Sequence, residues 1–300
     1  MPVQKPRRIG PVAGESLFDR IKAHTLHSTV WRRYLDALER EHPDLIIEDG
    51  GNLLAAEGPG VARLCYGFDN ERAFVERFPG MFEKLLPRVR RVLRADSVRL
   101  RLAYAPARPV VEPVLRKLWF QPSRDWIEFS LSRSTKVAAP PVPRGVRFRD
   151  GGVDDAEELL RIDREAFPDT PIPTGAFRVR LHEESVIVAE RRGEIAGFCL
   201  YSMYADAGWI SVLAVGEEHR GEGLGAALTV RAAKRLFAEG AQVAGLTTDD
   251  ANGAAIRLYV RLGFRQTHAG RDYVRPTDPR AVEKLQQENR GTLIKFGGWR

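Results

Sequence analysis

The sequence predicts an α/β (α+β) fold organised as two domains of similar layout, and three observations support this prediction. With 300 residues, of which 43% are hydrophobic and 29% charged, the chain is long enough for two domains and has an ordinary globular composition. A stretch rich in proline and alanine, residues 134–145, has no periodicity and is typical of a linker. Strand-like and helix-like segments follow each other in a similar order on both sides of it.

The C-terminal half has the clearest pattern. Strands are expected at 146–149, 185–201 (a hairpin turning at 191–193), 208–215 and 242–248, with two short strands ending near Tyr273. Helices are expected at 154–167, 175–184 and 224–239, and from Asn252 to about Gly263. The first of these helices carries apolar residues among acids and ends before Pro168.

The N-terminal half is predicted from similar signals. A hairpin is expected at 53–68 around 58–60, helices at 82–93 and 109–118, and strands at 97–104 and 125–132. A long helix is expected at 16–40, and the tail 276–300 is expected to hold a helix at 279–289 before an apolar and aromatic end.

A glycine-rich segment opens the expected helix at 224–239. It reads Arg220, Gly221, Glu222, Gly223, Leu224, Gly225 and Ala226. Backbone N–H groups at a helix start lack partners within the helix and carry partial positive charge, and glycine lets a ligand approach them closely. The segment therefore predicts a cradle for phosphate.

Three interpretations of this cradle compete. A P-loop is excluded because no Lys-Ser or Lys-Thr follows the glycines. A dinucleotide fingerprint remains a rival, because Gly221, Gly223 and Ala226 fit G-x-G-x-x-[G/A] and Asp249 follows the next strand. However, Asp249 lies beyond the usual distance of about 20 residues, and several residues separate the glycines from the preceding strand. The third interpretation is an R-x-x-G-x-G loop.

A second motif runs from Asn252 to Phe264. Its apolar residues recur at helical spacing, Asn252 is a good N-cap, and Gly263 suits a left-handed helix end. Tyr259 adjoins the apolar stripe. It is either a core tyrosine or a proton donor to a leaving thiolate, and the presence of both motifs favours the second interpretation.

Together the two motifs resemble those of the GCN5-related N-acetyltransferase (GNAT) family, over about residues 145–275. The resemblance implies two tandem domains, each with a mixed, mostly antiparallel twisted sheet flanked by helices. The expected boundaries are 1–134 for a degenerate copy, 135–145 for the linker, 146–275 for the catalytic domain and 276–300 for the tail.

The N-terminal half is expected to be the degenerate copy. A shift of 144 residues places Leu115 where Tyr259 stands, Arg108 where Asn252 stands and Trp119 where Gly263 stands. No glycine cradle precedes the helix at 82–93, so we expect only the C-terminal copy to bind acyl-CoA.

The resemblance also implies a reaction and a site. Acetyl would pass from acetyl-CoA, the co-substrate, directly to a primary amine, with no metal. Leu213, Ala214 and Val215 would pair with pantetheine and polarise the thioester. The cradle, residues 220–226, would hold the pyrophosphate, Asn252 would bond the pantetheine region, and Tyr259 would donate to the thiolate.

The general base and the acceptor are not defined by the sequence. Thr247 stands where some relatives carry Glu, which leaves as candidates Asp249, Asp250, Glu165 and Asp206. Candidates to line an acceptor pocket are Tyr201, Tyr204, Trp209 and Phe167. A rival function is non-catalytic: an acyl-CoA sensor, or a docking module that uses the basic N-terminal half.

Charge, cysteine content and hydropathy bound the remaining possibilities. The net charge of +7 arises in residues 1–144, where arginines cluster at Arg88, Arg90, Arg91, Arg94, Arg99 and Arg101. A solvated face explains this cluster better than nucleic acid does. Two isolated cysteines, no apolar run of membrane length and no secretory signal predict a cytoplasmic protein without disulfides. The oligomeric state is not predicted.

Overall fold

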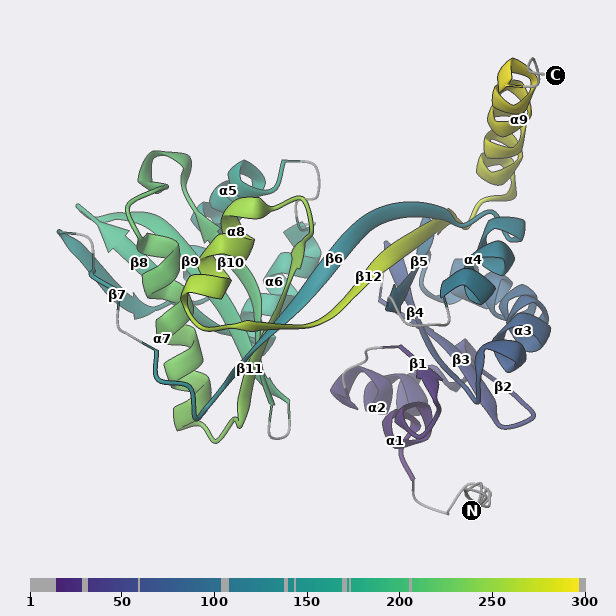
Figure 1. Ribbon diagram of the computed structural model, residues 1–300, viewed down its shortest axis with the longest axis horizontal. Coiled ribbons are helices and arrows are strands. Elements are labelled where there is room, and N and C mark those ends of the chain that lie inside the picture. Colours follow the sequence, from purple (N-terminus) through teal and green to yellow (C-terminus); the bar gives the residue numbers. More distant parts are fainter. Residues whose placement is uncertain are drawn as a thin grey trace. The chain divides into compact units, whose positions relative to one another are not determined.

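The chain divides into two units, each with its own hydrophobic core (Figure 1). Unit 1 comprises residues 1–125 and 269–300, and unit 2 comprises residues 126–268. The structure is a computed structural model. It describes residues 15–28, 32–58, 60–103, 108–137, 140–142, 144–168, 172, 174–204 and 207–296, with the backbone alone at 32–34, 176, 204 and 289–296.

Unit 1 is a sheet between helices. Its elements are α1 (Leu17–Lys22), β1 (Leu26–His27), α2 (Arg32–Glu41), the 3-10 turn η1 (Pro43–Leu45), β2 (Ile46–Asp49), β3 (Asn52–Glu57), β4 (Val61–Phe68), α3 (Glu71–Val92), β5 (Ser97–Ala103), α4 (Arg108–Lys117) and α9 (Pro279–Phe296). The strand order is β2-β3-β4-β5, followed by residues 270–276 of β12 (Arg265–Pro276). Only β4 and β5 run parallel, and β1 also pairs with β4.

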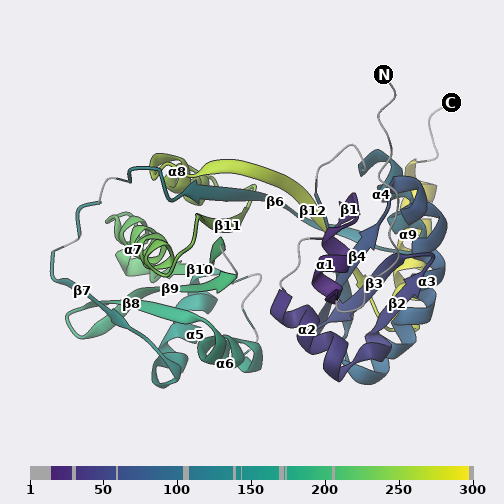
Figure 2. The same ribbon diagram turned by 90° about the horizontal axis from the view of Figure 1, so that it is seen from below.

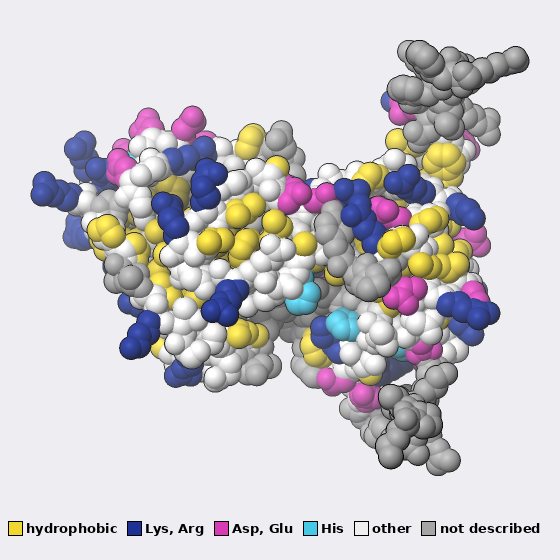
Figure 3. Space-filling model, in the orientation of Figure 1, with side chains coloured by type: hydrophobic (Ala, Val, Ile, Leu, Met, Phe, Trp, Pro, Cys, Tyr) yellow, Lys and Arg dark blue, Asp and Glu magenta, His cyan; other side chains and the backbone are white. Residues whose placement is uncertain are grey.

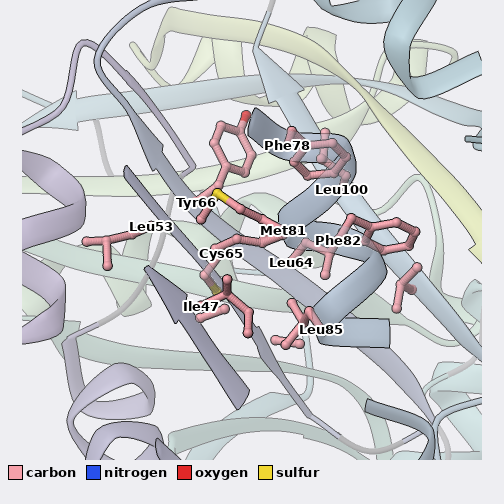
Figure 4. Packing of buried hydrophobic residues seen from close by; sticks show 14 of the residues in the cluster. Ile47, Leu53, Leu64, Cys65, Tyr66, Phe78, Met81, Phe82, Leu85 and Leu100 are labelled. Carbon is pink, nitrogen blue, oxygen red and sulfur yellow. The ribbon is translucent and has the colours of Figure 1, made fainter. Parts of the chain in front are cut away.

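Aromatic side chains of α3 form the centre of the unit 1 core. Phe74, Phe78 and Phe82 recur every four residues, so they lie on one face of the helix, where neighbouring rings stack with centroids 4.4 and 5.7 Å apart. Tyr66 and Phe68 of β4 pack against Phe74 of the same row. Figure 4 shows Tyr66 beside Phe78 and Phe82. α1 lies on the opposite face of β4, because a Cβ added to Gly67 would meet the main chain of Ile21 and the ring of His24.

The prediction of one long helix at 16–40 is wrong. The structure ends α1 at Lys22, pairs Leu26 and His27 with β4 and starts α2 at Arg32. Leu26 is buried there, and the hydroxyl of Ser28 accepts the backbone N–H of Tyr66 at 2.8 Å. Pairing with the sheet therefore outweighs the helical pattern of this segment.

The helix predicted at 82–93 begins eleven residues earlier, at Glu71. Asn70 caps it by accepting the N–H of Ala73 at 2.9 Å. Pro79 and Pro87 lie inside α3 and obscured its length in the sequence. The remaining strands and helices predicted for this half are confirmed to within a few residues.

Unit 2 is a six-stranded sheet with helices on both faces (Figure 2). Its elements are β6 (Gln121–Ser132, from Trp126 on), β7 (Val146–Asp150), η2 (Val153–Asp155), α5 (Ala156–Ala166), α6 (Thr174–Glu183), β8 (Ser185–Arg191), β9 (Glu194–Tyr204), β10 (Ala207–Val215), η3 (Glu217–His219), α7 (Leu224–Ala238), β11 (Val243–Asp249) and α8 (Gly253–Arg261). The order is β6-β11-β10-β9-β8-β7, with β10 and β11 parallel. α5 and α6 pack on one face, and α7 and α8 on the other.

The C-terminal strands differ from the prediction. One strand, β12, replaces the two short strands expected before Tyr273, and its residues 270–276 pair with β5 of unit 1. Conversely, residues 126–132 of β6 pair with β11 of unit 2. The last strand expected in each predicted half therefore belongs to the other unit, and the unit limits at 125 and 268 do not coincide with the predicted boundaries at 134 and 275.

The arginines of the N-terminal half do not form a single basic face. Arg88 and Arg91 of α3 bond the backbone and carboxylate of Asp44, whereas Arg101 of β5 pairs with the buried Asp272. On the face drawn in Figure 3, acidic and basic side chains are interspersed. Among the described residues, no helix is long and apolar enough to cross a membrane, and Cys65 and Cys199 are buried free thiols.

Candidate active site

The sheet of unit 2 opens between β10 and β11. The two strands pair from Ala207 opposite Val243 to Ile210 opposite Leu246, and their ladder stops there. β10 then continues along β9, with a bulge between Ile210 and Val212, while β11 continues along β6. Past Ile210, no strand among the described residues pairs with the β11-facing edge of β10, so its peptide groups can bond a ligand.

The predicted residues Leu213, Ala214 and Val215 lie on this open edge. The side chains of Leu213 and Val215 pack on the core beneath α7, and Ala214 is buried against the core of α5 and α6. With both faces covered by protein, this edge presents mainly peptide groups to its free side.

The predicted cradle directly follows this edge. Gly221 and Gly223 adopt left-handed backbone conformations, with φ of +79° and +88°, and Gly223 is the N-cap of α7. No side chain caps this helix start. The first-turn N–H groups, from Leu224 to Ala226, therefore lack a side-chain acceptor, which is the arrangement that suits an anion at a helix start.

The cradle also lies close to α8. A Cβ built on Gly225 would lie 3.6 Å from a methyl group of Leu258 and 3.8 and 3.9 Å from methyl groups of Val215 and Leu213. The start of α7, the end of β10 and the helix that carries Tyr259 therefore meet at one place. The structure brings the two sequence motifs together, as the resemblance implied.

Two charged cradle residues also tie the loop to its surroundings. Arg220 donates to the carbonyl oxygens of Val215 and Glu165, at 3.2 and 3.1 Å. Glu222 forms an ion pair with Arg191 of β8, which offsets its negative charge beside the proposed phosphate site. No local sequence pattern indicates this role of Arg191, because β8 and the cradle are distant along the chain.

Tyr259 lies at the inner face of α8, only 6% exposed, with its ring packed between Phe129 and Phe264. Burial, with a smaller contribution from Cys199, raises the pKa of its hydroxyl, so the group stays protonated at neutral pH and can donate a proton. The predicted helix ends are confirmed: Asn252 accepts the N–H of Ala255 at 3.1 Å, and Gly263 has a φ of +88°.

The acidic residues considered as bases have other contacts or lie elsewhere. Asp249 accepts the N–H of Ala251 at 2.9 Å, and Glu165 pairs with Arg161 along α5. Asp250 is exposed, and Asp206 lies outside the described residues. The sequence missed Glu184, a buried carboxylate beside the opening, because it lies at the junction of α6 and β8.

The aromatic candidates for an acceptor pocket separate in the structure. Tyr201 is buried in the α7-side core, and its hydroxyl oxygen accepts from Arg235 at 3.3 Å, so it is a core residue. Trp209 lies over Gly245 of β11, and Phe167 packs against the core of α5 and α6. The side chain of Tyr204 lies outside the described residues.

Solved structures with this fold include acetyltransferases. A tandem GNAT protein from the clavulanic acid biosynthesis pathway aligns over 87% of this chain and 93% of its own, with a TM-score of 0.62 and 16% identity. A GCN5-related N-acetyltransferase from Sphaerobacter thermophilus aligns over 76% and 77%, with a TM-score of 0.59 and 19% identity. These likenesses show the fold, which is that of tandem GNAT domains.

Sequence comparisons match part of the chain to known proteins. Residues 154–264 match the acetyltransferase (GNAT) family. The chain is 35% identical over 150 residues to the mycothiol acetyltransferase of Thermobispora bispora, covering 44% of this chain and 50% of that protein. It is 32% identical over 188 residues to that of Sanguibacter keddieii, covering 56% and 58%. The chain spans about half the length of the curated relatives it matches. Its residues 154–264 thus match the GNAT family, and its fold is similar to that of a tandem GNAT protein.

Proposed function

We propose that this protein transfers an acetyl group from acetyl-CoA to a primary amine, by direct attack of the amine within a ternary complex. One observation carries the proposal: the open edge of β10, the uncapped start of α7 and the helix α8, which carries Tyr259, meet at one place in unit 2. Holding thioester and amine together there would supply the proximity on which such a reaction depends.

The chain has suitable groups for each part of acetyl-CoA. The N–H groups of residues 221–226 would hold the pyrophosphate, with Arg220 adding charge. The peptide groups of Leu213, Ala214 and Val215 would bond pantetheine and polarise the thioester carbonyl. The side-chain oxygen of Asn252 caps α8, so the nitrogen of the same side-chain amide would be the group that bonds the pantetheine arm.

Tyr259 is the proposed proton donor to the departing thiolate. Its hydroxyl carries a proton at neutral pH, because burial raises its pKa, and the departing thiolate would take that proton as negative charge develops on sulfur. A binding module would need the cradle and the strand edge but no buried proton donor. The presence of Tyr259 beside them therefore favours catalysis over the rival function as an acyl-CoA sensor.

Turnover of acetyl-CoA with amines tests the proposal. We expect thiol release that depends on both acetyl-CoA and an amine, measured with a panel that contains amines related to mycothiol, aminoglycosides, polyamines, lysines and peptide N-termini. The amines related to mycothiol come first, because the sequence relatives are named mycothiol acetyltransferases. Tight binding of acetyl-CoA without turnover of any amine would instead support the sensor.

Unit 1 has features that would prevent it from binding a second acetyl-CoA. β4 and β5 part after Leu64 and Leu100, as β10 and β11 do, but here β1 pairs with β4 beyond that point. Because β3 already occupies the other edge of β4, β1 fills the side that faces β5. The hydroxyl of Tyr66 further bonds the carbonyl of Arg101 on β5, at 2.9 Å.

The helix start of unit 1 is also closed. Between β4 and α3 stand only Asp69 and Asn70, and Asn70 caps the helix with its own side chain. Trp119 retains a left-handed φ of +67° where Gly263 has +88°, and the buried Leu115 stands in place of Tyr259. Unit 1 thus keeps the backbone of the second motif without its chemistry, as the proposed degenerate copy would.

We therefore expect one acetyl-CoA per chain. Isothermal titration of the full chain should give a stoichiometry of one, because β1 occupies the space between β4 and β5 where unit 1 would bind a second acetyl-CoA. Two equivalents would contradict this explanation. A variant with a disabled α7 cradle that still binds one equivalent of acetyl-CoA with unchanged affinity would also contradict it.

A further inference from the structure

Two hydroxyl side chains flank the point where β10 and β11 separate. Ile210 opposite Leu246 is the last pair of the ladder, so Ser211 and Thr247 are the next residues on the two strands. Leu246 faces the α7-side core, and side chains alternate along a strand, so Thr247 faces the opposite side of the sheet. Its Oγ1 atom is buried and has no hydrogen-bond partner within the described part of the chain.

Ser211 connects this point to a buried carboxylate. It sits in the bulge of β10, and its Oγ donates to Oε2 of Glu184, with the carbonyl oxygen of Leu200 as a second acceptor at 3.3 Å. A hydroxyl has a single proton. When Ser211 donates to Glu184, its lone pairs therefore remain to accept a hydrogen bond from a ligand in the opening.

Glu184 is fixed by groups from several elements. Its side chain is 3% exposed and pairs with Arg180 of α6 at 2.7 Å. Asp163 of α5, fully buried, also interacts with the charge of Arg180, and Cys199 of β9 interacts with that of Glu184. A carboxylate buried so deeply requires these partners, and only through Ser211 does a described contact connect it to the open strand edge.

We propose that Glu184 accepts the proton that the acceptor amine must lose, and that this proton passes through the hydroxyl of Ser211. The inference rests on the proposed acetyl transfer. An acceptor ammonium would donate hydrogen bonds to Ser211 and Thr247 at the opening. These two hydroxyls thereby select a primary amine, and Glu184 acts through Ser211 without touching the substrate.

The protons and electrons balance as follows. One N–H bond of the ammonium breaks, its proton passes to Ser211, and the proton of Ser211 passes to Glu184. The nitrogen lone pair then bonds the thioester carbon, and the C–S bond breaks with its electron pair on sulfur. The sulfur then takes the proton of Tyr259. Nitrogen loses a second proton, which returns Tyr259 to its protonated form, and Glu184 releases its own proton to solvent.

Three variants of the full chain test the relay, with acetyl-CoA and an amine from the panel that the unaltered protein acetylates. We expect Ser211→Ala and Glu184→Gln each to lower kcat about 10²-fold, with unchanged affinity for CoA. Because both remove the same pathway, the double variant should lose no more than either single one. Glu183→Gln makes the same change at the neighbouring, exposed carboxylate, so it serves as the control and should keep kcat.

The dependence of kcat/KM on pH separates a proton acceptor from a structural brace. Glu184 must be ionised to accept a proton, so the acidic limb of the profile should disappear in Glu184→Gln and reappear in Glu184→Asp. If Glu184→Gln unfolds because Arg180 loses its partner, Ser211→Ala keeps that pair and still tests the pathway. A folded Ser211→Ala with undiminished kcat would overturn the relay alone, whereas absence of any turnover by the unaltered protein would overturn acetyl transfer and the relay together.

Discussion

Replacing Tyr259 by Phe is expected to lower kcat about 10²-fold while the affinity for acetyl-CoA stays within about twofold, because one positioned proton donor contributes roughly this much to a rate. The hydroxyl is the only group lost, and the ring can still pack between Phe129 and Phe264. Steady-state kinetics and isothermal titration measure the two quantities separately.

Tyr273→Phe is the matched control. Tyr273 is also a buried tyrosine with a raised pKa, but it belongs to unit 1, where its hydroxyl donates to Glu112. This variant should lose some thermal stability and keep its kcat. If Tyr259→Phe were as active as the unaltered protein, Tyr259 would have no part in the reaction.

Replacing Gly223 by Val is expected to weaken acetyl-CoA binding at least about tenfold. A β-branched residue at a φ of +88° is strained by about 1–2 kcal/mol, and about 1.4 kcal/mol corresponds to a factor of ten in affinity. The strain falls on the N-cap of α7. If the backbone there changes conformation to relieve the strain, the first N–H groups of the helix turn away from the pyrophosphate. Titration with acetyl-CoA measures the loss.

Gly240→Val provides the control for this strain. Gly240 follows the other end of α7 and has a φ of +111°. A Cβ added to Gly240 would meet nothing within 4 Å, and one added to Gly223 would meet a single atom at 4.0 Å. Both variants should lose stability, but Gly240→Val should bind acetyl-CoA as the unaltered protein does. Equal affinities in the two variants would show that the start of α7 does not hold the ligand.

The sequence predicted those parts of the site that depend on local geometry. The glycine-rich start of α7, the cap at Asn252 and the left-handed helix end at Gly263 each follow from a few adjacent residues, and the structure has all of them. The bulge at Ser211 and the parting of β10 from β11 depend instead on pairing with strands elsewhere in the chain, for which no local pattern exists.

Contacts between distant segments account for most of what the sequence missed. Glu184 and Arg191 reach the site from α6 and β8 only because of the register of the sheet. The segment at Leu26 has a helical pattern, yet a free strand edge of β4 pairs with it. The long strand β12 is defined by its pairing with β5, far from it in sequence.

A crystal structure of the full chain with CoA would test the central claim most directly. The account predicts one CoA per chain, with its pyrophosphate on the N–H groups of Gly223 to Ala226 and its pantetheine arm along Leu213, Ala214 and Val215, between β10 and β11. A pyrophosphate bound elsewhere in unit 2, or a CoA between β4 and β5 with β1 displaced, would contradict it.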